Sequence, residues 1–105
     1  MGIIVTACFK PNEGKTDELL EVMSGHLPLV QSKGLATERD SMRMISLDGT
    51  VIEIFEWASE EASQKAHVDE DVQKIWGRLG EIAEYVPIGG LEEAVHPFSG
   101  FHACD

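Results

Sequence analysis

Basic residues, cysteine and long apolar runs are scarce in this sequence. Lysine and arginine number 8 against 19 aspartate and glutamate residues, so the formal net charge is −11 at pH 7. A surface of this sign repels nucleic-acid phosphates and anionic lipid headgroups, because both bind to clustered Lys and Arg. We therefore expect neither a nucleic-acid partner nor a membrane partner.

The number of cysteines and the sequence of the first ten residues indicate the cellular compartment in which the protein works. The two cysteines, Cys8 and Cys104, are far apart in the chain, which is typical of reduced thiols rather than of a disulfide framework. The first ten residues, MGIIVTACFK, lack the basic segment that precedes the apolar run of a signal peptide. No stretch approaches the ~18 consecutive apolar residues of a membrane span. These features predict a cytoplasmic protein.

Several motifs that define common sites are also missing. No glycine-rich loop with a lysine follows a predicted strand, and there is no G-x-S-x-G nucleophile motif. His96, His102 and Cys104 lie close together near the C-terminus, but their spacing matches no structural zinc pattern. The sequence therefore predicts no phosphate site, no serine nucleophile and no bound metal.

What is present fits one compact α+β domain. The chain has 105 residues, of which 43% are hydrophobic, a typical size for a single core. Residues 3–9 are apolar and β-branched, which predicts a buried strand. A helical period follows from Thr16 to a stop at Gly34, and Pro28 with the nearby Gly25 predicts a kink in that helix.

Residues 35–58 are typical of a β-hairpin. Asp48-Gly49 favours a two-residue turn, since both central positions of a type I′ turn need positive φ. This turn would place Met44 opposite Glu53 and Met42 opposite Phe55. Both faces of the hairpin are then largely apolar, so we expect both faces of the sheet to be covered.

A second helix is predicted from Ser59, with an interruption at residues 69–71, and a last strand at residues 91–95. The resulting order, β-α-β-β-α-β, is ferredoxin-like: a four-stranded antiparallel sheet with two helices on one face. We expect a domain at residues 1–95 and a loose C-terminal tail at 96–105. Because the other face is still apolar, we expect a homodimer formed by sheet-on-sheet packing.

The segment IEIFEWASEEASQKAHVDEDVQKIWGRL resembles the antibiotic biosynthesis monooxygenase-like family of the dimeric α/β barrel superfamily. The resemblance spans roughly residues 2–95. It implies a pocket between sheet and helices, and oxidation of aromatic quinols without a cofactor. The haem-degrading relatives carry Asn, Trp and His where this chain has Ala7, His67 and Gly77, so the resemblance implies no haem.

His67 is the candidate catalytic residue. It lies beside the apolar stripe of the second helix, where an imidazole could take a proton from a phenol or quinol and leave an anion that reacts with oxygen. The alternative is a helix histidine that is satisfied at the surface or by a backbone carbonyl. The family resemblance is the main support for the catalytic interpretation.

Six further residues are predicted to line the pocket, and they suit a hydrophobic, planar small molecule. Glu53 could serve as a base with a pKa raised by burial, or as half of an ion pair with Arg43. We expect a cofactor-independent monooxygenase acting on a phenol or quinol. A non-catalytic binding module and an oxygen-independent isomerase or lyase stay open as alternatives. The pocket residues are Met42, Met44, Glu53, Phe55, Trp57 and Trp76.

Overall fold

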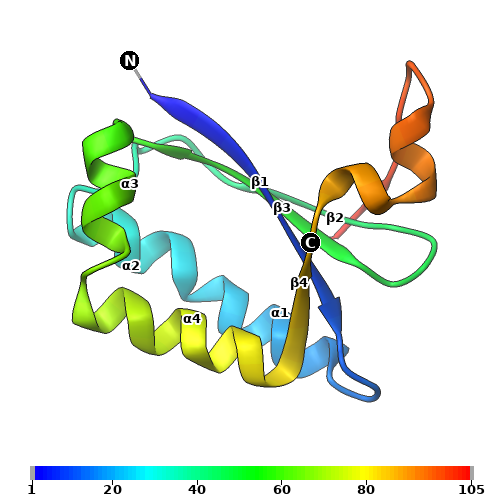
Figure 1. Cartoon of the computed structure of the whole chain (residues 1–105), viewed down its shortest axis with the longest axis horizontal. Coiled ribbons are helices and arrows are strands. Elements are labelled where there is room, and N and C mark those ends of the chain that lie inside the picture. Colours follow the sequence, from blue (N-terminus) through cyan, green and yellow to red (C-terminus); the bar gives the residue numbers. More distant parts are fainter. Residues whose placement is uncertain (1, 105) are drawn as a thin grey trace.

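The computed structural model describes residues 2–104 as one α+β unit. The first strand, the helical segment after it and the two strands of the hairpin follow the predicted order (Figure 1). The elements along the chain are β1 (Ile3–Pro11), α1 (Thr16–Ser24), α2 (His26–Ser32), β2 (Met42–Ile45), β3 (Val51–Trp57), α3 (Glu60–Ala66), α4 (Glu70–Ile82), β4 (Ala83–Val86), the 3-10 turns η1 (Ile88–Gly90) and η2 (Glu92–Val95), and β5 (His102–Ala103).

The sheet has the order β4-β1-β3-β2-β5, with every neighbouring pair antiparallel. Its first four strands have the ferredoxin-like arrangement, and α1, α2 and α4 lie on one side of them (Figure 1). The predicted α+β class is confirmed. The predicted number of four strands is wrong, because β5 adds a fifth strand beside β2. The predicted last strand at residues 91–95 is also wrong, since β4 begins directly where α4 ends.

Helices α3 and α4 each begin at a polar capping residue. Ser59 accepts a hydrogen bond from the Ala62 backbone nitrogen at 3.0 Å, and so caps α3. Asp69 caps α4 in the same way, through the Val72 nitrogen at 3.0 Å. The predicted interruption of the second helix is thus confirmed, and the first helix breaks at Gly25.

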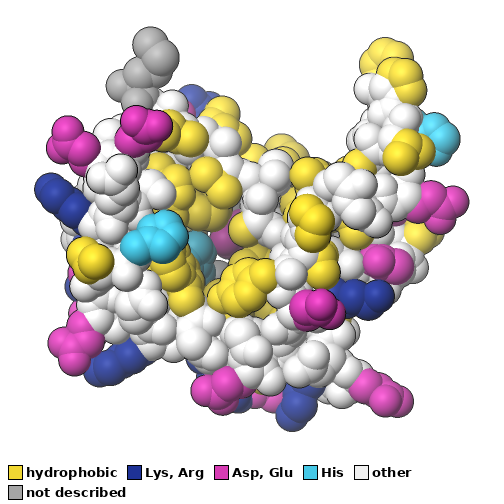
Figure 2. All heavy atoms as spheres, in the orientation of Figure 1, with side chains coloured by type: hydrophobic (Ala, Val, Ile, Leu, Met, Phe, Trp, Pro, Cys, Tyr) yellow, Lys and Arg dark blue, Asp and Glu magenta, His cyan; other side chains and the backbone are white. Residues whose placement is uncertain are grey.

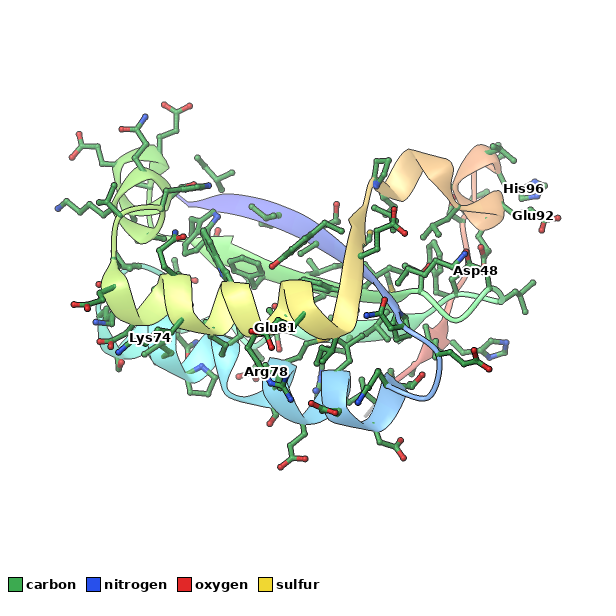
Figure 3. All side chains as sticks on the ribbon, turned by 60° about the horizontal axis from the view of Figure 1, so that its bottom comes forward. Asp48, Lys74, Arg78, Glu81, Glu92 and His96 are labelled. Carbon is green, nitrogen blue, oxygen red and sulfur yellow. The ribbon has the colours of Figure 1, made fainter. Side chains whose placement is uncertain are left out.

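A charged side chain joins α4 to α1 on the outer side of the helices. Arg78 extends from α4 toward α1, where it pairs with Glu18, and it also bonds Glu81 at 3.2 Å (Figure 3). Glu18 and Glu81 therefore lie on the solvent side of this helix layer. The side of the helices that faces the sheet is mostly apolar and aromatic, with the buried His26 as a polar exception.

The turn of the β2–β3 hairpin has one residue more than predicted. The Ser46 nitrogen donates to the Thr50 carbonyl at 2.8 Å, so the loop is residues 47–49, with Gly49 at φ 92°. Met42 therefore pairs with Ile54, and Arg43 with Glu53. A shift of one residue moves every side chain of a strand to the opposite face. Arg43 thus shares the helix-covered face with Glu53, contrary to the predicted register.

The second face of the sheet is partly covered by the C-terminal segment of the same chain. Leu91 packs against Cys8 and Ile52 in a buried cluster, with Phe101 beside it. Residues 96–105 were predicted to be a loose tail, but residues 102–103 form β5, and the Cys104 nitrogen donates to the Arg43 carbonyl at 3.0 Å. Within residues 2–104, no helix is both long and apolar enough to cross a bilayer.

Candidate active site

A cavity of about 270 Å³ lies between the sheet and the helices. Figure 2 shows a hollow in this face of the molecule, bordered by hydrophobic and histidine side chains. The strands β1, β3 and β4 supply one wall, and α2, α4 and the end of α3 supply the others. The residues that line the cavity are Val5, Ala7, Phe9, His26, Phe55, Trp57, His67, Trp76 and Tyr85. The lining is almost entirely apolar and rich in aromatic rings.

His67 lies at the mouth of this cavity, directly after the last residue of α3. Its Nδ1 is 2.8 Å from the Ser63 carbonyl oxygen. Because a carbonyl can only accept, Nδ1 carries a proton, and in the neutral ring the lone pair is on Nε2. The side chain is exposed, and its ring meets Trp76 edge to face with centroids 5.0 Å apart. The ring nitrogen that is free of protein hydrogen bonds among the described residues is therefore Nε2, on a residue that lines the cavity.

A buried pair, His26 and Glu53, lies deeper in the site. His26 is 3% exposed and Glu53 is 1% exposed, and the His26 Nδ1 is 3.0 Å from the Glu53 Oε1. The indole Nε1 of Trp76 donates to the His26 Nε2 at 2.9 Å. Sequence analysis missed His26, because a histidine directly after Gly25 carries no local signal that its side chain is buried.

Glu53 contacts the cavity only through His26. Its own side chain lines a separate, more polar hollow beside Asp40 and Arg43. The suggested ion pair with Arg43 is not found within residues 2–104, although the two residues face each other across β2 and β3. The Arg43 guanidinium instead donates to the Leu20 carbonyl at 3.4 Å. Glu53 is thus a hydrogen-bond partner of His26.

Tyr85 closes the cavity from β4. Its hydroxyl donates to the Trp76 carbonyl at 2.8 Å, and partial burial raises the pKa of this phenol above its usual value. Tyr85 therefore stays neutral at physiological pH and keeps two lone pairs on its oxygen. The sequence predicts no strand at residues 83–86, so the position of Tyr85 in the cavity wall was missed.

The six predicted pocket residues divide into two groups, and Glu53, which lines the separate hollow, belongs to the group that does not line this cavity. Phe55, Trp57 and Trp76 line the cavity together with His67. Met42 and Met44 do not, and this part of the prediction is corrected: they project from the opposite face of the sheet, because the hairpin turn is one residue longer than predicted. Their neighbours on that face are Ile54 and Ile52.

The histidines near the C-terminus belong to neither group. Figure 3 places His96 at the end of the molecule remote from α3. Within residues 2–104, no group of three His, Cys, Asp or Glu side chains is arranged to hold a metal ion. The chemistry that the cavity offers is thus proton transfer and aromatic contact, from His67, Tyr85 and the indole rings.

Fold and cavity together define an α+β protein of the ferredoxin-like type, with a small aromatic cavity between sheet and helices. The chain is similar in structure to a NIPSNAP family protein from Agrobacterium tumefaciens, with a TM-score of 0.58 and 21% identity. The match covers 80% of this chain and 85% of that chain. At this identity the likeness shows the fold alone. No family model and no curated protein matches the chain.

Proposed function

We propose that this protein oxidises a small planar phenol or quinol with molecular oxygen, without a resident cofactor, as the antibiotic biosynthesis monooxygenase-like resemblance implies. One observation carries the proposal: the imidazole of His67 presents a lone pair at the mouth of an apolar, aromatic cavity. Imidazole is the side chain best suited to accept a proton near neutral pH.

The cavity suits a neutral ring rather than a charged ligand. Its volume of about 270 Å³ lies just below the 300–1,000 Å³ that is usual for ligand pockets, which favours one or two rings. Phe55, Trp57 and Trp76 supply ring faces and edges against which a planar ligand packs. No Lys or Arg lines the cavity, so a phosphate or carboxylate ligand would lack a charged partner.

The reaction begins with transfer of the phenol proton to the His67 Nε2. The resulting phenolate is electron-rich, so its ring carbon can bond to oxygen and form a hydroperoxide after protonation by the imidazolium. Loss of the ring C–H proton and cleavage of the O–O bond then give a quinone and water. One phenol and one O₂ yield one quinone and one water, and the four electrons that reduce O₂ come from the substrate.

Oxygen uptake by the protein, freed of metal and flavin, with a panel of one-ring and two-ring phenols and quinols tests this function. We expect one O₂ consumed per quinone formed, and loss of uptake in His67→Ala. If a panel compound binds both proteins equally and no oxygen is consumed, the protein is a binding module. If a carbonyl compound is converted without oxygen, the protein is an isomerase or lyase.

We also propose that the functional unit is a homodimer formed through the second face of the sheet. Ile4 and Met42 project from this face and are 59% and 62% exposed, although the C-terminal segment covers the part around Leu91. Large apolar side chains gathered on one face of a sheet favour burial against a partner. Pairing of this face with a second copy would cover both side chains in each subunit.

A further inference from the structure

Three side chains form a continuous chain of hydrogen bonds from the buried sheet to the cavity wall. Glu53 comes from β3, His26 from the start of α2 and Trp76 from the middle of α4. The Glu53 Oε1 lies 3.0 Å from the His26 Nδ1, and the His26 Nε2 lies 2.9 Å from the Trp76 Nε1. The mechanism proposed above uses neither His26 nor Glu53.

Only one arrangement of protons satisfies both bonds. An indole nitrogen can only donate, so the His26 Nε2 accepts from Trp76 and has no proton. The His26 Nδ1 then carries the proton and donates it to the Glu53 carboxylate. The two bonds therefore assign His26 the tautomer with the proton on Nδ1, and its lone pair is committed to Trp76 rather than to a ligand.

Packing holds the same three groups in place. The His26 ring meets Phe55 edge to face, with centroids 5.3 Å apart and planes inclined at 88°. The Trp76 indole contacts His67 on one side and Trp57 on another, with centroids 5.0 and 6.4 Å away. The Tyr85 hydroxyl bonds the Trp76 carbonyl. Thus the backbone and the ring nitrogen of Trp76 are each tied to a different element.

We propose that His26 and Glu53 are positioning residues that fix the Trp76 indole as a wall of the cavity and thereby decide how large a ring the cavity accepts. A tryptophan side chain turns about two torsions, so packing alone leaves the indole other orientations in a cavity with open space beside it. The hydrogen bond from the indole N–H to His26 selects one of them. This inference rests on the proposed function only in taking the ligand to be a planar phenol.

Two substitutions of His26 separate positioning from general packing. In His26→Asn, the amide occupies the position of Nδ1, so it still donates to Glu53 but cannot reach Trp76. In His26→Gln, the longer amide reaches the position of Nε2 and can accept from the indole. His26→Asn thus keeps the partner of the Glu53 carboxylate, and His26→Gln keeps the partner of the Trp76 indole. If His26→Asn does not fold, His26→Leu replaces it as the variant without the Trp76 bond.

The first readout is the hydrogen exchange of the tryptophan indole N–H groups, followed by NMR without any ligand. We expect the Trp76 indole proton to exchange at least about tenfold faster in His26→Asn than in the wild type, and near the wild-type rate in His26→Gln. The indole of Trp57, which shares the aromatic cluster and makes no bond to His26, is the internal control. Equal exchange of the Trp76 proton in all three proteins would overturn the positioning role.

The second readout is the ratio of the dissociation constants of phenol and 2-naphthol, measured by calorimetry. We expect this ratio to change at least about tenfold in His26→Asn and to stay at the wild-type value in His26→Gln. An unchanged ratio, with faster exchange, would overturn the role in selecting ring size. Failure of both probes to bind the wild type would overturn that role and the proposed ligand class, whereas the exchange result would still decide whether the indole is fixed.

Discussion

The imidazole of His67 meets the indole of Trp76 edge to face, with ring centroids 5.0 Å apart and ring planes inclined at 72°. The same imidazole is tied to the Ser63 carbonyl through Nδ1 at 2.8 Å. One contact comes from the preceding turn of the chain and the other from α4. Together they fix the ring at the cavity mouth, although its side chain is exposed, and they direct the lone pair to Nε2.

Replacement of His67 by Phe tests the base directly. Phenylalanine keeps an aromatic ring against Trp76 but has no lone pair, so we expect the turnover of a phenol substrate to fall at least about 100-fold. We expect the free energy of unfolding to change by less than about 1 kcal/mol, because the side chain is exposed. Oxygen uptake and urea denaturation measure the two quantities. The neighbouring exposed Val68, replaced by Ala, is the control, and full activity in His67→Phe would exclude His67 as the base.

Replacement of Glu53 tests the buried pair through stability. Glu53→Ala leaves the His26 Nδ1–H without an acceptor and opens a cavity, so we expect a loss of about 2–5 kcal/mol in the free energy of unfolding. Glu53→Gln keeps an amide oxygen for the same N–H, and we expect it to recover about half of that loss or more. Urea denaturation of both variants at pH 7 measures the difference. Equal losses in the two variants would show that the hydrogen bond to His26 is not what Glu53 contributes.

The order of the elements could be predicted because their signals are local. The period changes at Thr16 and Ser59 mark helix starts, and the two sheet-forming strands of the hairpin flank a glycine turn. The placement of β4 could not be predicted, because α4 passes directly into the strand between the apolar residues Ile82 and Ala83. Its apolar residues continue the helical stripe, and only the antiparallel pairing with β1 makes this segment a strand.

Site residues could be predicted from the sequence only where they lie on the same strand or helix. Phe55 and Trp57 alternate along β3, so their common face was evident from the sequence. The error for Met42 and Met44 came from a single turn residue, since Asp48-Gly49 fits both a two-residue loop and the three-residue loop that forms. The hydrogen bond between His26 and Trp76 links residues that are 50 positions apart in the chain. A contact of that range has no signal in the local sequence around either residue.

Acidic pH should loosen the contact between the C-terminal segment and the hairpin. The Glu93 carboxylate accepts from the Leu47 nitrogen at 2.9 Å and from the Ser46 hydroxyl at 3.0 Å, and the backbone bond is the main cause that lowers its pKa. A lowered pKa in the folded state means that the ionised group stabilises the fold above the ordinary Glu pKa of about 4.3. That contribution is lost as the pH falls through the lower, folded pKa.

We therefore expect the free energy of unfolding of Glu93→Gln to fall less steeply than that of the wild type as the pH is lowered from about 5 to 3. Urea denaturation at a series of pH values gives the two curves, and their difference removes the general effect of net charge. Glu92→Gln, a change at the exposed neighbour, serves as the control and should follow the wild-type curve after the same loss of one charge. Parallel curves for Glu93→Gln and the wild type would show that these hydrogen bonds do not favour the ionised form.

The proposed dimer predicts a specific response to charge on the second face of the sheet. Light scattering at micromolar concentration should give about twice the chain mass of 11.5 kDa for the wild type. Met42→Asp places a carboxylate among apolar side chains in the interface, where burial without a partner is costly, so we expect dissociation to monomers. Val68→Asp adds the same charge at a side chain that is 83% exposed beyond α3, and it should stay dimeric. A wild-type protein that scatters as a monomer would exclude the dimer, and equal dissociation of both variants would show that net charge, rather than this face, decides the assembly.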